Sequence, residues 1–97
     1  KIIVRRGEVI TSEILEKNDL DYKNINSKIK VLLSKTRDKI KKRGSIVNEI
    51  NTRGDFIKKI RESLKTKQNN KYLLEVVSLK DSKTADSIVV ELNISEL

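Results

Sequence analysis

The sequence contains no cysteine and no histidine. These absences exclude a disulfide scaffold, a catalytic cysteine, a histidine-based triad, and the usual zinc and haem sites. Proline is also absent, which argues against a low-complexity linker. The three glycines are isolated, so the chain has no glycine-rich loop for phosphate. No apolar run approaches the ~20 residues of a membrane span, and there is no signal-peptide pattern.

The 97 residues nevertheless contain enough apolar side chains for a thin core. Ile, Leu, Val and Phe make up about a third of the chain, above the ~20% that is typical of disordered sequences. A chain of this size buries roughly 60–65% of its unfolded surface. We therefore expect one domain over residues 1–97. Because the sequence starts at Lys1 rather than Met, we also expect it to be a fragment of a longer protein.

The net charge of +8 is concentrated in one segment. Residues 22–43 hold nine basic side chains and one acidic side chain, whereas basic and acidic residues balance in the rest of the chain. A segment of one sign can attract phosphate backbones or anionic lipid head groups. The alternative is a lysine-rich helix face that is simply solvated.

Residues 22–43 have the spacing of an amphipathic helix. Apolar residues and one threonine recur three or four positions apart, at Tyr22, Ile25, Ile29, Leu32, Leu33, Thr36 and Ile40. Asp21 is expected to cap the first turn, and Gly44 is expected to end the helix in the left-handed conformation. We predict that Ile25, Ile29, Leu32 and Ile40 are buried and face Ile57, Ile60, Val76, Val90 and Leu92.

The remaining segments predict strands around a second helix. Residues 1–15 are extended with a turn or bulge at residues 6–8, residues 45–50 form a weak strand, and residues 53–66 form a helix. Residues 71–79 and 87–95 alternate as two strands of an antiparallel hairpin, joined by a polar loop at residues 80–86. The sequence therefore predicts an α+β domain of order β(β)-α-β-α-β-β. Its two helices would pack on one small, mostly antiparallel sheet of four to five strands.

No motif supports catalysis or a bound cofactor. The tripeptide at residues 53–55 matches that of integrin ligands, but a helix-capping role for Asp55 explains it. The acidic residues Glu8, Glu13 and Glu16 are close in sequence without forming a catalytic constellation. We therefore predict a protein that is not an enzyme, with no catalytic, cofactor-binding or metal-binding residues and no small-molecule substrate.

The basic helix suggests an electrostatic contact with nucleic acid or an anionic membrane. The only aromatic residues are Tyr22, Phe56 and Tyr72, and the helical spacing places the first two on apolar faces, so base stacking on single strands is not expected. One row of cations shares a side of the helix and is the candidate anion contact. This row consists of Lys28, Lys35, Lys39 and Lys42.

Three segments together resemble a bacterial family catalogued as domain of unknown function number three thousand and eighty-four. They are the opening Ile2 to Ile10, the basic helix ending at Arg43-Gly44, and the closing pair of strands that ends with Val89 to Ile94. The resemblance implies a module at the C-terminal end of a membrane-anchored coiled-coil protein. It also implies a location inside the cell or on the cytoplasmic face of the membrane, and transfers no catalytic residue.

The function expected from these observations is a non-catalytic interaction or assembly module of a larger, envelope-associated bacterial protein. The alternative is an electrostatic binder of nucleic acid or anionic membrane through the basic helix. Strand edges in so small a sheet are hard to cover, so we also expect a symmetric homodimer formed through a strand edge or an apolar helix stripe.

Overall fold

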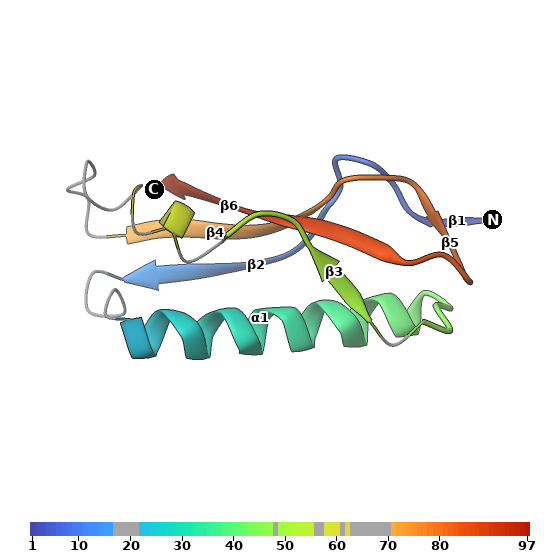
Figure 1. The fold of residues 1–97 in the computed structure, drawn as a ribbon, viewed down its shortest axis with the longest axis horizontal. Helices are drawn as coiled ribbons and strands as arrows, with labels where there is room; N and C mark the ends of the chain where they lie inside the picture. Colours follow the sequence, from blue (N-terminus) through green and yellow to red (C-terminus); the bar gives the residue numbers. More distant parts are fainter. Residues whose placement is uncertain (17–21, 48, 56–57, 61, 63–70) are drawn as a thin grey trace.

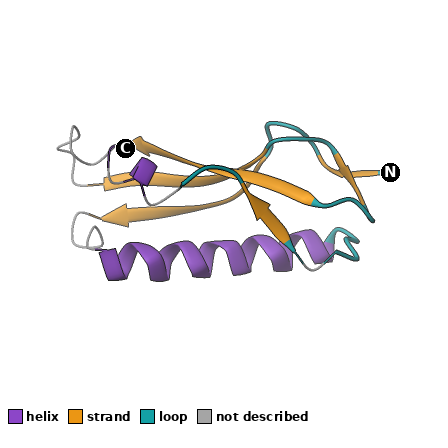
Figure 2. Cartoon of the chain, in the orientation of Figure 1, coloured by secondary structure: helices purple, strands orange, loops and turns teal. Residues whose placement is uncertain are grey.

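A computed structural model describes residues 1–16, 22–47, 49–55, 58–60, 62 and 71–97. The fold is α+β, as predicted: one long helix lies along a small sheet (Figure 1). The strands and the long helix are β1 (Ile2–Val4), β2 (Val9–Glu16), α1 (Tyr22–Lys42), β3 (Ile50–Thr52), β4 (Lys71–Ser78), β5 (Ser82–Lys83) and β6 (Ile88–Glu96). Residues 58–60 and 62 are helical as well (Figure 2).

The strands form two sheets rather than the single predicted one. The larger sheet has the order β2-β4-β6-β3, in which β4 is antiparallel to both β2 and β6, and β3 is parallel to β6. The smaller sheet pairs β1 with β5. Residues 80–86 are therefore not only a loop. Ser82 and Lys83 form a strand because β1 offers them backbone partners, not because of their side chains.

The prediction of a strand over residues 45–50 is wrong, because the strand begins at Ile50 and ends at Thr52. Ser45 lies just beyond α1 and takes part in its C-terminal cap, because its N–H donates to the Ile40 carbonyl at 3.2 Å. Ile46 is 74% exposed, and its N–H donates to Thr84 O at 3.0 Å. Ile46 and Val47 thus follow the turn that ends the helix without forming a strand. The strand starts at Ile50, the first residue that pairs with β6.

The predicted apolar face of α1 is buried against the sheet. Ile25, Ile29, Leu32 and Ile40 are at most 7% exposed, and Thr36 on the same face is fully buried. The core also contains Ile60, Val76, Val90 and Leu92, as predicted, whereas Ile57 lies outside the described residues. Helical spacing therefore identified the packed side of α1 correctly.

The end of α1 follows from Gly44. The Gly44 N–H donates to Lys41 O at 3.0 Å and the Ser45 N–H donates to Ile40 O, which is the hydrogen-bond pair of a Schellman motif. Gly44 has a φ of 108°, in the region that other residues rarely adopt. The predicted cap at Asp21 lies outside the described residues.

Asp55 begins the second helical segment. Its Oδ1 accepts a hydrogen bond from the Lys58 N–H at 3.1 Å, and its carbonyl accepts one from the Lys59 N–H at 3.0 Å. This is the geometry of an N-cap residue. The capping interpretation of the tripeptide at residues 53–55 is therefore confirmed.

Candidate functional site: a basic helix beside an edge strand

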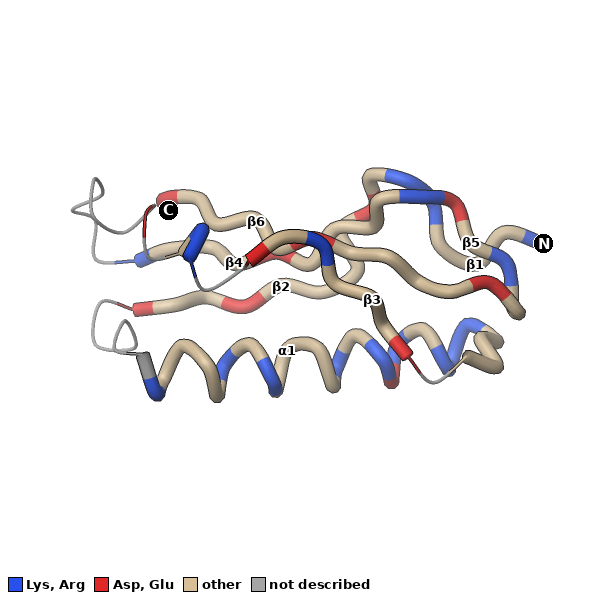
Figure 3. The backbone as a smooth tube through the Cα atoms, viewed as in Figure 1, with Lys and Arg blue, Asp and Glu red and all other residues tan. Residues whose placement is uncertain are grey.

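The cations of α1 fall into two rows on opposite sides of the helix. We call the four predicted residues Lys28, Lys35, Lys39 and Lys42 the inner row, because this side adjoins β2. The other four cations of α1 form the outer row: Lys23, Lys30, Arg37 and Lys41. Figure 3 shows basic residues along the whole length of α1, whereas the strands carry both signs.

Two lysines of the inner row contact β2. Lys39 Nζ donates to the Ile10 carbonyl at 2.7 Å, and Lys35 Nζ lies 3.6 Å from Glu13 Oε2. Lys28 is half-buried and Lys42 is exposed. The inner row thus lies on one side of the helix, as predicted, but part of its charge is directed at the neighbouring strand rather than at solvent.

β2 lies at one edge of the larger sheet, and its backbone groups face alternately inward and outward. On β4, the Lys71 carbonyl faces β6, because it accepts a hydrogen bond from the Leu97 N–H. The backbone groups of the alternate residues Tyr72 and Leu74 therefore face the opposite way, toward β2. These two residues pair with Leu15 and Glu13, respectively. The N–H and C=O groups of the alternate β2 residues, Ser12 and Ile14, therefore face away from β4.

The hydrogen bond from Lys39 lies at a register shift in β2. Ile10 is skipped in the pairing with β4, between Val9 and Thr11, and its carbonyl accepts from a side chain of α1 instead. Lys39 thus occupies one acceptor of the free edge and leaves the next outward-facing positions, Ser12 and Ile14, without a strand partner in the described part of the chain. The Ile14 side chain is 50% exposed.

A shallow cavity of about 390 Å³ opens between α1 and this edge. Its walls combine one exposed apolar side chain with polar and charged ones: Glu13, Asn24, Ser27, Lys28, Val31 and Lys35. Val31 is 52% exposed, although it belongs to a helix with a well-covered apolar face. The cavity therefore offers an apolar contact between two lysines, directly beside unpaired backbone groups.

The outer row has a different environment. All four of its side chains are exposed, and none has a hydrogen bond or ion pair in the described part of the chain. The sequence prediction overlooked this row because it considered only one side of the helix. The seven-residue steps from Lys23 to Lys30 to Arg37 were a signal that could have revealed it.

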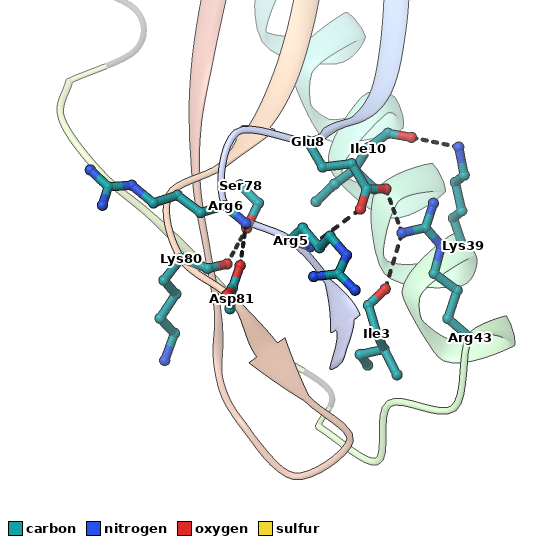
Figure 4. Close-up of polar contacts among 10 residues, drawn as sticks. All are labelled: Ile3, Arg5, Arg6, Glu8, Ile10, Lys39, Arg43, Ser78, Lys80 and Asp81. Carbon is teal, nitrogen blue, oxygen red and sulfur yellow. Dashed lines mark hydrogen bonds and ion pairs between the residues drawn. The ribbon is translucent and has the colours of Figure 1, made fainter. Parts of the chain in front are cut away.

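The C-terminal end of α1 is fixed to the turn between β1 and β2 (Figure 4). Arg43 Nη1 donates to Glu8 Oε2 at 2.5 Å and to Ile3 O at 3.2 Å. The Arg5 N–H donates to Glu8 Oε1 at 3.3 Å, and the Arg6 N–H donates to Asp81 Oδ1 at 2.7 Å. The two Arg43 contacts attach the end of α1 to this turn, and the other two hydrogen bonds fix the turn itself.

Opposing effects act on the pKa of Glu8. Partial burial raises this pKa, whereas the hydrogen bonds from Arg43 and the Arg5 N–H, with the positive charges of Arg43 and Lys39, lower it. The lowering effects prevail, so the pKa of Glu8 lies below its ordinary value of 4.5. Glu8 is therefore a charged anchor for the helix end at neutral pH.

No family model, curated protein or solved structure matches this chain. Among the described residues, no helix has the length and apolar character that crossing a bilayer requires.

Proposed function

We propose that this domain is a non-catalytic interaction module that binds an extended, acidic segment of a partner protein along the free edge of β2. The observation that carries the proposal is the outward-facing backbone of Ser12 and Ile14 beside the α1 cavity. An extended peptide can add a strand to such an edge, with main-chain hydrogen bonds giving affinity and side-chain pockets giving specificity.

The side chains that line the cavity favour a peptide with both apolar and acidic residues. Alternate side chains of an added strand would point toward α1, where Val31 offers an apolar contact between Lys28 and Lys35. Lys35 keeps 60% of its side chain exposed despite the ion pair with Glu13, so it retains donors for a second carboxylate. Acidic side chains on the added strand therefore complement this side of α1.

The same charge argues against pairing of two copies through β2. An antiparallel β2–β2 contact would bring two α1 helices together, each with eight basic residues and one acidic residue. Like charges across an interface cost energy and suppress association. The predicted homodimer would therefore need a different surface, and light scattering after gel filtration at rising concentration tests it.

The resemblance to the bacterial family extends this proposal to the parent protein. A module at the end of a membrane-anchored coiled coil would present its β2 edge to partners inside the cell or at the cytoplasmic face. Fractionation of cells that express the parent protein tests this location.

A defined peptide tests the binding mode. Fluorescence anisotropy with a labelled repeat of Val-Glu should show binding, and a repeat of Val-Lys should not bind. Ser12→Pro removes one outward-facing N–H without removing a β4 hydrogen bond, so it should abolish binding. Ser12→Ala keeps that N–H and is the matched control. Equal binding of the acidic peptide by wild type and Ser12→Pro would contradict strand addition.

A further inference from the structure

In the first half of α1, the solvent side of the helix has the inner row on one flank, the outer row on the other, and no charge between them. At about 100° per residue, the inner and outer rows lie roughly 70° to either side of a line through Ser27, Val31 and Ser34. These three residues, which we call the crest, are uncharged and face solvent. This arrangement differs from a uniformly basic surface because the charges flank the crest rather than cover it.

We propose that α1 enters the major groove of duplex DNA and contacts the phosphates through its outer row. The major groove of B-DNA is about 12 Å wide and admits an α-helix. With α1 in this groove, the inner and outer rows would lie nearest the two phosphate backbones, and the crest would lie nearest the bases. The short serine side chains of the crest permit this approach, and their hydroxyls can donate or accept hydrogen bonds.

Of the two rows, the outer row is better suited to contact phosphate. Its residues Lys23, Lys30 and Arg37 are separated by about 10.5 Å along the helix axis, because each step is seven residues. All are exposed and lack partners in the described part of the chain. Phosphate binding by the outer row would therefore break no ion pair in the described part of the chain. Phosphate binding by Lys35 of the inner row would compete with its ion pair to Glu13.

Asp38 places the closest approach between α1 and the bases in the first half of the helix, while the outer row contacts phosphate along its whole length. Its position continues the line of the crest near the C-terminal end, where a carboxylate would repel phosphate. In the same region, Lys39 donates a hydrogen bond to the Ile10 carbonyl, so its charge is directed at β2. The first half of α1 has Lys28 as the cation on the inner side and no acidic residue.

Other polyanions fit this surface less well. Binding of an amphipathic helix to a membrane requires an apolar face that enters the bilayer, and Val31 is the only large hydrophobic side chain exposed on the described part of α1. Single-stranded nucleic acids stack on exposed aromatics, but the one aromatic side chain that the structure describes, Tyr72, is buried at 1% exposure. The deep, narrow major groove of A-form RNA does not admit side chains.

Salt-dependent anisotropy with a labelled DNA duplex of about 20 base pairs tests the proposal. Four outer-row contacts imply about a hundredfold loss of affinity between about 50 and 200 mM salt. Replacement of Lys23, Lys30, Arg37 and Lys41 by Gln should reduce the salt slope by about 4. A control variant removes the same charge from exposed cations elsewhere, at Arg5, Lys58, Lys71 and Lys83, and should keep most of the slope.

The result that overturns the proposal is an equal salt slope in wild type and the outer-row variant, or an equal loss in the control variant. Equal or tighter wild-type binding to phosphatidylserine vesicles or an RNA duplex would also overturn the assignment to DNA. Circular dichroism of both variants establishes that they fold. Ser12→Pro should leave DNA binding unchanged, so failure of this proposal is distinguishable from failure of peptide binding at β2.

Discussion

The hydroxyl oxygens of Thr11 and Thr36 lie 2.5 Å apart and connect β2 to the buried face of α1. Thr36 Oγ1 also donates to Leu32 O at 2.7 Å, which uses its one hydrogen. Thr11 is therefore the donor in the contact between the two hydroxyls. Thr36 is fully buried, so this is a satisfied polar contact within an otherwise apolar interface.

We expect the two threonines to be energetically coupled. Thr36→Val removes the acceptor of Thr11 and should lower the free energy of unfolding by about 1–2 kcal/mol. Replacing both residues by Val should cost less than the sum of the single changes, because no polar group then loses its partner. Urea denaturation of the wild type, both single variants and the double variant measures the coupling. Strictly additive effects would show that the hydroxyls do not interact.

Adjacent residues on α1 provide a matched pair for the core. Leu32 is 1% exposed and Val31 is 52% exposed. Leu32→Ala should cost about 2–5 kcal/mol because it leaves a cavity, whereas Val31→Ala should change stability by less than about 0.5 kcal/mol. The denaturant midpoints of the two variants measure this difference. Similar midpoints would indicate that the wrong face of α1 has been assigned to the core.

Gly44 should tolerate substitution poorly for conformational reasons alone. An added Cβ would meet only Thr84 Cγ2 at 3.7 Å, an ordinary contact, but the φ of 108° is unfavourable for other residues. Gly44→Ala should therefore lower stability by about 1–2 kcal/mol. Gly44→Asn should lose less, because Asn adopts left-handed backbone more readily. Thermal melts compare the two variants, and a larger loss in Gly44→Asn would contradict this explanation.

The contribution of Glu8 should depend on pH. Since the pKa of Glu8 in the folded protein lies below its ordinary value of 4.5, the charged carboxylate stabilises the fold above that pH. This stabilisation is lost as the pH falls below about 4.5 and through the folded pKa. The difference in unfolding free energy between wild type and Glu8→Gln should therefore shrink from about pH 6 to about pH 3.

Arg43 provides the control for this pH effect. In an Arg43→Gln background, Glu8 loses its side-chain hydrogen bond and its main nearby positive charge. The pH-dependent effect of adding the Glu8→Gln substitution to this background should then become much smaller. An undiminished effect would mean that Arg43 is not the cause of the lowered pKa.

Local patterns in the sequence predicted the elements whose own side chains determine them. The spacing of Ile25, Ile29 and Leu32 identified both α1 and its buried face. The alternation in residues 71–79 and 87–95 predicted β4 and β6 close to their observed bounds, and their antiparallel pairing is confirmed. These features depend on periodic burial, which is visible without knowing the neighbours.

Elements that depend on distant backbone partners were not predictable in this way. Ser82 and Lys83 are polar and become a strand only because Val4 and Ile2 pair with them. The parallel pairing of Ile50 with Ile88 likewise fixes where β3 begins. For the candidate site, spacing placed the inner row on one side of α1, but the contact of Lys39 with a β2 carbonyl required knowledge of the packing.

The order of strand pairing also determines when this domain can form during protein synthesis. α1 leaves the ribosome before β4 and β6, which supply Val76, Val90 and Leu92 to its buried face. β1 pairs with β5, which lies between β4 and β6 in the sequence. Because these contacts join distant parts of the chain, β2 is the one long strand available to cover the apolar face of the nascent helix until β4 and β6 have been translated. The domain therefore depends on its final strand for completion, and a ribosome stalled before residue 88 would hold a chain that is prone to aggregate.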